Sequence, residues 1–244
     1  MDAPHPAHFG EKISTAFFLT SIGGCLDAYT YIEHGGIFAS TQTGNLILSA
    51  LALTQFNFGH FLERILPVIA FSFGILLANW IHHNLDKYKL NYWKVYILII
   101  EITLSIIVGF LKHNVPQLVI TTSMSLTTAL QLSTFNTMSG FGYSNMFSTG
   151  NLQKTMNNLF LYLKTKDDEF KTKLIYYSGL VFSFLCGAFE ASILSIFLHT
   201  KTIWVVSVEL IIILLFQFKF ILIYKKIIKK NFNKEVLFYS DFTY

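Results

Sequence analysis

The most constraining feature of the sequence is a series of long apolar runs that carry almost no charge. The run from Ile65 to Ile81, for example, contains no charged residue. A helix needs roughly 20 mainly apolar residues to cross the hydrocarbon core of a bilayer. We therefore expect an all-α integral membrane protein with a single membrane domain over residues 1–244. The six predicted spans have approximate bounds of 13–32, 61–83, 94–111, 115–138, 174–198 and 202–224.

Composition supports this class and excludes others. Charged residues make up 13% of the chain, against about 25% in a typical soluble domain. A basic tail at 225–244 could bind nucleic acid, but lysines after a final apolar run are more typical of a cytoplasmic membrane anchor. We expect the lipid bilayer as a partner and no nucleic acid. Cys25 and Cys186 lie in apolar runs, where thiols usually pack as small side chains. The first 12 residues lack the basic start of a secretory signal, so the first run is expected to remain as a span.

The placement of basic residues predicts the topology. If the N-terminus is cytoplasmic, fifteen of the 18 Lys and Arg residues fall in cytoplasmic segments, and Arg64, Lys112 and Lys201 remain outside. Lys and Arg are enriched on the cytoplasmic side, so both termini are expected there. A count of eight spans would treat the segments after two Thr-Gly-Asn motifs as full spans. The first of these, Leu46–Leu53, is an apolar stretch of only eight residues, which favours six spans and two short inserted helices.

The tetrapeptide Thr-Gly-Asn-Leu occurs at Thr43–Leu46 and again at Thr149–Leu152, an offset of 106 positions. Each copy follows an apolar run and precedes a stretch that we expect to form a short apolar helix. These matches indicate two internal repeats, about 13–111 and 115–224, with three spans each. An odd number of spans inverts the second repeat, which is the plan of many secondary transporters with a site near the membrane midplane. Three further pairs keep the same order, namely Gly36 and Gly142, Gly74 and Gly187, and Glu101 and Glu209.

The segment GGCLDAYTYIEHGGIFASTQTGN, residues 23–45, resembles the signature of the YoaK family of bacterial membrane proteins, which is defined by a domain of unknown function. Members carry a Gly-x-x-Asp-Ala element, then Thr-Gly-Asn, and a weaker second motif after a Gln-Asn pair. This chain has Gln131 followed by Leu132 and Ser133, so it departs from the family at the second amide. The resemblance implies a multi-pass protein of the bacterial inner membrane, loosely described as a small permease, with no known substrate.

Three acidic residues fall inside predicted spans and are candidates for proton or ion coupling. Asp27 lies in the first span, and Glu101 and Glu209 occupy matching places in the two repeats. An ionisable group in hydrocarbon is costly unless it faces the bundle interior or water, so such residues often mark a functional site. The alternative is a buried hydrogen-bond acceptor that holds helices together. Glu190 lies nearer a span end and is a weaker candidate.

The two Thr-Gly-Asn motifs suit the start of a helix. Thr or Asn could cap free backbone N–H groups and Gly could allow a close turn. Helix starts that point into the membrane would attract an anionic or polar substrate; alternatively, they only shape the fold. The substrate-binding or coupling candidates are therefore Asp27, Thr43, Gly44, Asn45, Glu101, Gln131, Thr149, Gly150, Asn151 and Glu209.

Other chemistry finds little support in the sequence. The adjacent pair His82 and His83 points in different directions on a helix and has no further ligand nearby, so no metal or cofactor is expected. Motifs of soluble enzymes are lacking, and intramembrane hydrolysis by Asp27 with Glu101 remains a minor alternative. We therefore expect a secondary transporter of an unknown small molecule or ion, possessing no enzymatic activity. A non-transporting membrane partner or assembly protein is the alternative, and the oligomeric state, including a homo-oligomer, stays open.

Overall fold

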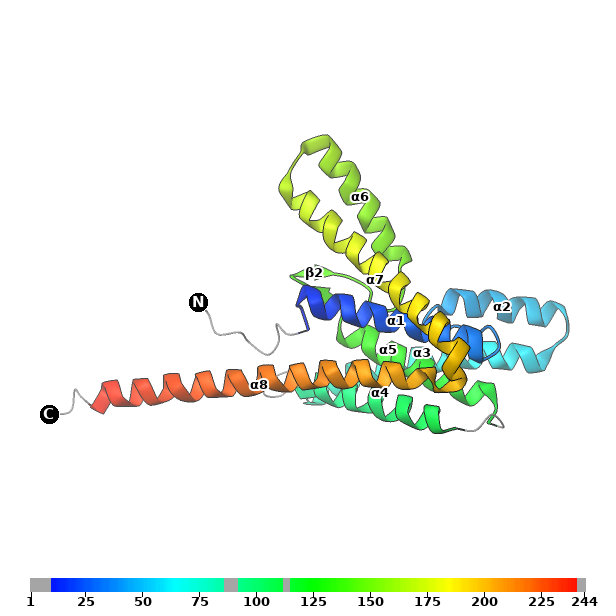
Figure 1. Cartoon of the computed structure of the whole chain (residues 1–244), viewed down its shortest axis with the longest axis horizontal. Helices are drawn as coiled ribbons and strands as arrows, with labels where there is room; N and C mark the ends of the chain where they lie inside the picture. The colour runs from blue at the N-terminus through cyan, green and yellow to red at the C-terminus, as the bar shows by residue number, and fades with distance from the viewer. Residues whose placement is uncertain (1–9, 86–91, 112–114, 241–244) are drawn as a thin grey trace.

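The computed structural model describes residues 10–85, 92–111 and 115–240, and it is almost entirely helical (Figure 1). Two short helices contain the two Thr-Gly-Asn motifs in their first turns, and a two-stranded hairpin precedes the second of them. The helices are α1 (Ile13–Glu33), α2 (Gln42–Thr54), α3 (Phe58–Leu85), α4 (Tyr92–Phe110), α5 (Gln117–Thr134), α6 (Thr149–Thr165), α7 (Asp168–Leu198) and α8 (Ile203–Ser240), with a 3-10 turn η3 (His199–Thr202) and strands β1 (Thr137–Met138) and β2 (Phe141–Gly142).

The bundle is organised around α1 and α5. The two most extensive helix contacts are those of α1 with α7 and of α3 with α5. The short helices α2 and α6 fold back on α3 and α7, while α4 and α8 lie side by side along one edge (Figure 1). The α6–α7 hairpin projects away from the rest of the bundle. The side chains of α1 are mostly buried, because other helices surround it.

Glycines allow the two central helix pairs to approach closely. A Cβ added to Gly24 of α1 would overlap the backbone oxygen of Phe184, and one added to Gly187 of α7 would overlap that of Ser21. In the α3–α5 pair, a Cβ on Gly74 would lie 2.8 Å from the Leu126 oxygen. Small residues at crossings are the usual way for membrane helices to pack, because lipid supplies no hydrophobic drive between them.

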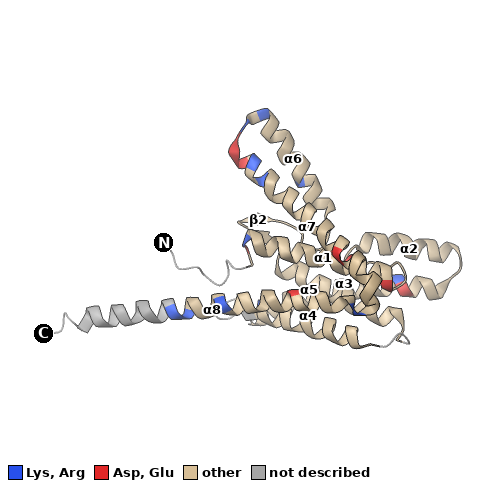
Figure 2. Ribbon diagram, viewed as in Figure 1, with Lys and Arg blue, Asp and Glu red and all other residues tan. Residues whose placement is uncertain are grey.

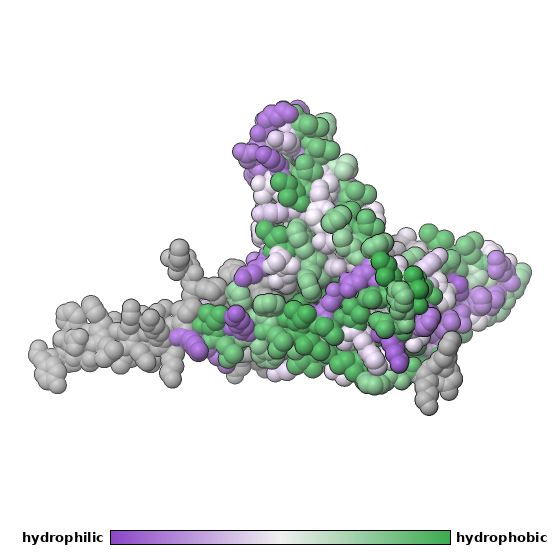
Figure 3. Space-filling model, viewed as in Figure 1, coloured by the Kyte–Doolittle hydropathy of each residue, from purple (hydrophilic) through white to green (hydrophobic). Residues whose placement is uncertain are grey.

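The outer surface is apolar, as expected for a protein that faces lipid. Large exposed side chains such as Phe182, Phe189 and Leu215 lie on α7 and α8, and hydrophobic residues cover much of the coloured part of the face in Figure 3. Charged residues gather at helix ends and at the α6–α7 turn (Figure 2), while Asp27, Glu101 and Glu209 lie within helices. A charge-poor apolar belt with charged ends is what a bilayer requires.

Three helical stretches of the described residues are long and apolar enough to cross a membrane. They are Phe58–Leu85, Trp93–Phe110 and the stretch Asp168–Lys226, which covers α7 and the part of α8 up to Lys226. The central helices α1 and α5 are not among them, because small and polar residues interrupt their sequences. The six-span count therefore stays a prediction.

Several predicted boundaries need correction. The predicted span 115–138 is too long, because α5 ends at Thr134 and the chain then forms an antiparallel hairpin that pairs Thr137 with Gly142. Ser139 and Gly140 make its turn, both with positive φ. The tail predicted from 225 continues α8 to Ser240. The predicted cytoplasmic Lys87 and Lys89, the external Lys112, and the side chains of Lys229, Lys230 and Lys234 lie outside the described part of the chain.

Candidate functional site

Asp27 lies buried on α1 and fixes the loop that precedes α2, residues 34–41. Its side chain is 4% exposed. Oδ1 accepts a hydrogen bond from the Ser40 N–H at 2.6 Å, and Oδ2 lies 2.7 Å from Ser40 Oγ and 2.6 Å from Thr41 Oγ1. The loop therefore turns back from the C-terminal end of α1 to meet the helix more than one turn earlier. The predicted intramembrane acid is thus buried and engaged by hydroxyl groups.

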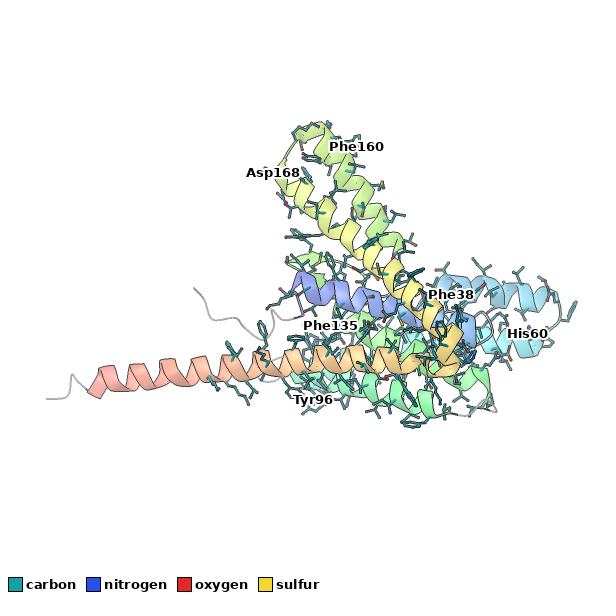
Figure 4. The ribbon with its side chains drawn as sticks, viewed as in Figure 1. Phe38, His60, Tyr96, Phe135, Phe160 and Asp168 are labelled. Atoms are coloured by element: carbon teal, nitrogen blue, oxygen red, sulfur yellow. The ribbon has the colours of Figure 1, made fainter. Side chains whose placement is uncertain are left out.

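A second loop, residues 143–148 between β2 and α6, reaches the same part of α1 from the other end of that helix. Ser40 Oγ also contacts the carbonyl oxygen of Met146, which lies just before α6. Gly23, one turn before Asp27, makes room for this loop, since a Cβ there would overlap the Asn145 oxygen and lie 3.1 Å from Met146 Cα. Phe38 lies near the C-terminal end of α1 and Phe135 near its N-terminal part (Figure 4). The two loops therefore approach from opposite ends of α1 and meet at Ser40 and Met146.

The two motif asparagines make the same contacts in both loops. Asn45 Nδ2 donates to the Phe38 carbonyl at 2.8 Å, and the Phe38 N–H donates to Asn45 Oδ1 at 3.1 Å. Asn151 makes the equivalent bonds to Ser144, at 2.7 Å and 3.2 Å. Both asparagines are almost fully buried. Each side chain closes a loop of seven residues onto the first turn of its helix.

The predicted capping role of the Thr-Gly-Asn motifs is wrong. The N-cap residues are Thr41 and Ser148, and neither caps its helix with a side-chain hydrogen bond. Thr43 and Thr149 are exposed residues in the first turns. Gly44 and Gly150 have no positive φ, whereas Gly35, Gly36 and Gly140 do, so the tight turns come earlier than expected. The motif instead supplies the asparagines that hold the loops.

Gln131 holds α5 against α1, and Asn145 holds the second loop against the end of α5. Gln131 Nε2 donates to the Leu19 carbonyl of α1 at 3.0 Å, and Asn145 Nδ2 donates to the Phe135 carbonyl at 2.7 Å. Sequence reasoning selected Gln131 but missed Asn145 and Ser40. The sequence feature that could have identified Asn145 and Ser40 is that each is a polar residue a few positions before a motif asparagine, in an otherwise apolar part of the chain.

The two glutamates on α4 and α8 do not join Asp27. Glu101 is 1% exposed, and neither of its carboxylate oxygens has a hydrogen-bond partner within the described residues. One carboxylate oxygen of Glu209 is also buried without a hydrogen-bond partner among the described residues. Glu209 interacts electrostatically with Glu190 of α7 and with Cys25 of α1. Asp27 and Glu101 share no hydrogen bond and form no carboxylate dyad in the described structure.

The two sides of the site differ in openness. A cavity of about 420 Å³ lies beside the first loop, between Gly36, Leu48 of α2 and Arg64 of α3. At the corresponding place in the second loop, Lys154 Nζ and the Tyr177 hydroxyl both donate to the Gly142 carbonyl, at 2.6 Å and 2.9 Å. Lys154 stands 106 positions after Leu48 and is its counterpart in the second predicted repeat. The charged Lys154 side chain covers Gly142, whereas the apolar Leu48 borders the cavity beside Gly36.

No group of three His, Cys, Asp or Glu side chains in the described ranges is placed to hold a metal ion. The two cysteines are free, Cys25 being buried and Cys186 exposed on the apolar surface. The expected packing role therefore holds for Cys25 alone.

Comparisons with known proteins give a family and little more. No curated protein and no solved structure matches the chain. A family model described as "Protein of unknown function (DUF1275)" matches residues 15–216, in agreement with the resemblance to YoaK proteins, and the chain therefore belongs to that family.

Proposed function

We propose that the protein is a secondary transporter of a small solute in the bacterial inner membrane, with both termini in the cytoplasm. The observation that carries the proposal is the meeting of two loops from opposite ends of α1 at Ser40 and Met146. Non-helical backbone at membrane depth is tolerated where it is buried in protein or lines a cavity, and transporters place their sites there.

The arrangement of contacts favours two inverted repeats, α1–α4 and α5–α8. The pairing of α1 with α7 corresponds to that of α5 with α3, and α4 pairs with its own counterpart α8. The equivalent bonds of Asn45 and Asn151 follow the same relation. In such a transporter, motion of one repeat against the other would open the central site to each side in turn.

The buried acids supply a means of coupling. Asp27 lies where the two loops meet, and Glu101 and Glu209 lie on the paired helices α4 and α8. A carboxyl group in this setting can carry a proton in one state and release it in another. The cavity beside the first loop, together with the covering of Gly142 by Lys154, supports a conformation in which the central site is open toward one side of the membrane.

A proteoliposome assay tests the proposal. The purified chain is reconstituted with an internal pH-sensitive dye, and a panel of small solutes is added outside. We expect at least one solute to drive proton movement that Asp27→Asn and Glu101→Gln each abolish without unfolding the protein. Solute-driven flux that both variants retain would remove these residues from coupling.

A non-transporting membrane partner is the second candidate, and one observation favours it. Asp27 is fully engaged by Ser40 and Thr41, as a purely structural acceptor would be. The α6–α7 hairpin, with its exposed Phe160 and Phe182, would then contact another membrane protein or a second copy of this chain. In that case the same substitutions would lower thermal stability, no solute would drive flux, and one partner would copurify in fixed proportion.

A further inference from the structure

Ser40 has one hydroxyl hydrogen and two acceptors. Its Oγ lies 2.7 Å from Asp27 Oδ2 and also contacts the Met146 carbonyl oxygen. A serine hydroxyl donates one hydrogen bond and accepts up to two. The Met146 carbonyl can only accept, so a bond between these loops must use the Ser40 hydrogen. The contact with Asp27 then needs another hydrogen.

Asp27 can supply that hydrogen when it is protonated. A proton on Oδ2 donates to Ser40 Oγ, and Ser40 donates onward to Met146. Oδ1 accepts from the Ser40 N–H in either state, and Oδ2 retains a lone pair for the Thr41 hydroxyl. When Asp27 loses the proton, its carboxylate becomes the stronger acceptor. The Ser40 hydroxyl then turns to Asp27, and the Met146 carbonyl loses its donor.

We infer that Ser40 is a positioning residue that links the protonation of Asp27 to the contact between the two loops. This inference rests on the proposed proton coupling and names the element through which it would act. Protonated Asp27 joins the loops through Ser40, whereas ionised Asp27 releases the loop that leads into α6. A buried carbonyl without a donor is unfavourable, so release favours separation of the loops.

Other titratable groups do not replace Asp27 in this arrangement. The acids that reach this part of α1 from the helices packed against it are Glu190 of α7 and Glu209 of α8. Both interact electrostatically with Cys25, whereas the hydrogen-bond partners of Asp27 are Ser40 and Thr41. From α5, the neutral Gln131 side chain bonds to the α1 backbone. The loop contact should therefore follow the protonation of a single carboxyl group.

Distance measurement between spin labels tests the inference. Leu46 on α2 and Leu152 on α6 are exposed and stand at equivalent places, so each is replaced by cysteine in a Cys186→Ala background. Double electron–electron resonance in nanodiscs then reports the separation of α2 and α6 from acid to alkaline pH. We expect a shorter distance at acid pH and a longer one at alkaline pH.

Three variants separate the link from general destabilisation. Asp27→Asn keeps the shape and can donate to Ser40 Oγ, so it should hold the short distance at every pH. Ser40→Ala removes the link and should hold the long distance at every pH. Thr41→Val, the matched control, removes one donor to Asp27 but keeps Ser40, so the distance should still change with pH. The Asp27→Asn result carries the test even where Ser40→Ala does not fold.

Two results would overturn the inference. They are a distance that does not change with pH in the parent protein, and a change that persists in Ser40→Ala. Flux measured on the same samples distinguishes this failure from failure of the proposed function. Asp27-dependent flux with a fixed distance overturns the link alone. A pH-dependent distance without solute-driven flux supports the link and removes transport.

Discussion

The side chain of Asn45 hydrogen-bonds to both backbone polar groups of Phe38. It donates to the carbonyl at 2.8 Å and accepts from the N–H at 3.1 Å. A side-chain amide carries its donor and its acceptor on separate atoms, so it can make both bonds at once. The bonds return the loop onto α2 and satisfy backbone groups that would otherwise be buried without hydrogen bonds. Asn151 makes the same bonds to Ser144, which explains physically why both copies of the motif contain asparagine.

Replacement of Asn45 by Asp should destabilise the fold. The carboxylate keeps the acceptor but loses the donor, which leaves the Phe38 carbonyl unpaired beside a negative charge. We expect a loss of roughly 1–3 kcal/mol in the free energy of unfolding, measured by denaturant titration in detergent. Thr54→Ala is the control, since Thr54 lies exposed in the same helix and its loss should change stability by no more than about 0.5 kcal/mol. Equal stability of Asn45→Asp and the parent protein would contradict this role.

Alanine substitutions should distinguish packing glycines from motif glycines. Gly24→Ala forces α1 and α7 apart, because the new Cβ meets the Phe184 backbone, and overpacking of this kind costs about 1–3 kcal/mol. Gly150 lies in α6, and a Cβ there meets no atom within 4 Å. Gly150→Ala should therefore stabilise the helix by about 0.4–1 kcal/mol.

Thermal unfolding of the two glycine variants checks this prediction. A large loss of stability in Gly150→Ala would show that α6 packs differently from the structure. If Gly150→Ala is stable but abolishes solute-driven flux, the motif glycine serves transport rather than folding.

The helical fold class could be predicted from the sequence, because it depends on local composition, and the doubled motif marked the two asparagines that make equivalent bonds. The hydropathy pattern predicted a span over residues 13–32, and its end lies within one residue of the end of α1 at Glu33. It could not foresee the hairpin at Thr137–Gly142, since those residues form a turn through backbone φ values rather than through polarity. The contact of Ser40 with Met146 depends on two loops folding back from opposite directions, which no local pattern encodes. For the same reason the asparagines were mistaken for helix caps.

Replacement of Glu101 by Met should preserve or increase stability. Both carboxylate oxygens of Glu101 are buried without a hydrogen-bond partner in the described structure, and removing an unsatisfied buried polar group of this kind relieves roughly 1–3 kcal/mol of desolvation cost. Met has a similar length and no polar group to satisfy. Denaturant titration of Glu101→Met beside Asp27→Leu, which removes an engaged acceptor and should destabilise, measures the difference. A marked loss of stability in Glu101→Met would indicate a structural bond to this carboxylate.

Labelling of the two hairpin turns should decide between six and eight spans. The α2–α3 turn contains Asn57 and the α6–α7 turn contains Asp167. Helix α2 has 13 residues, about 20 Å at 1.5 Å per residue, which is short of a hydrocarbon core of about 30 Å. The turn at Asn57 should therefore stay on the outer side, where α2 re-enters, while Asp167 lies in the cytoplasm.

Single cysteines at these positions, in a Cys186→Ala background, are treated with a membrane-impermeant maleimide in intact spheroplasts. We expect Asn57→Cys to react directly and Asp167→Cys to react only after the membrane is opened. If α2 spanned the membrane, both positions would be cytoplasmic and neither would react in intact spheroplasts. Because α2 and α6 are the helices that carry the motif asparagines, external reaction at Asn57 alone would place the two motifs on opposite sides, as inverted repeats require.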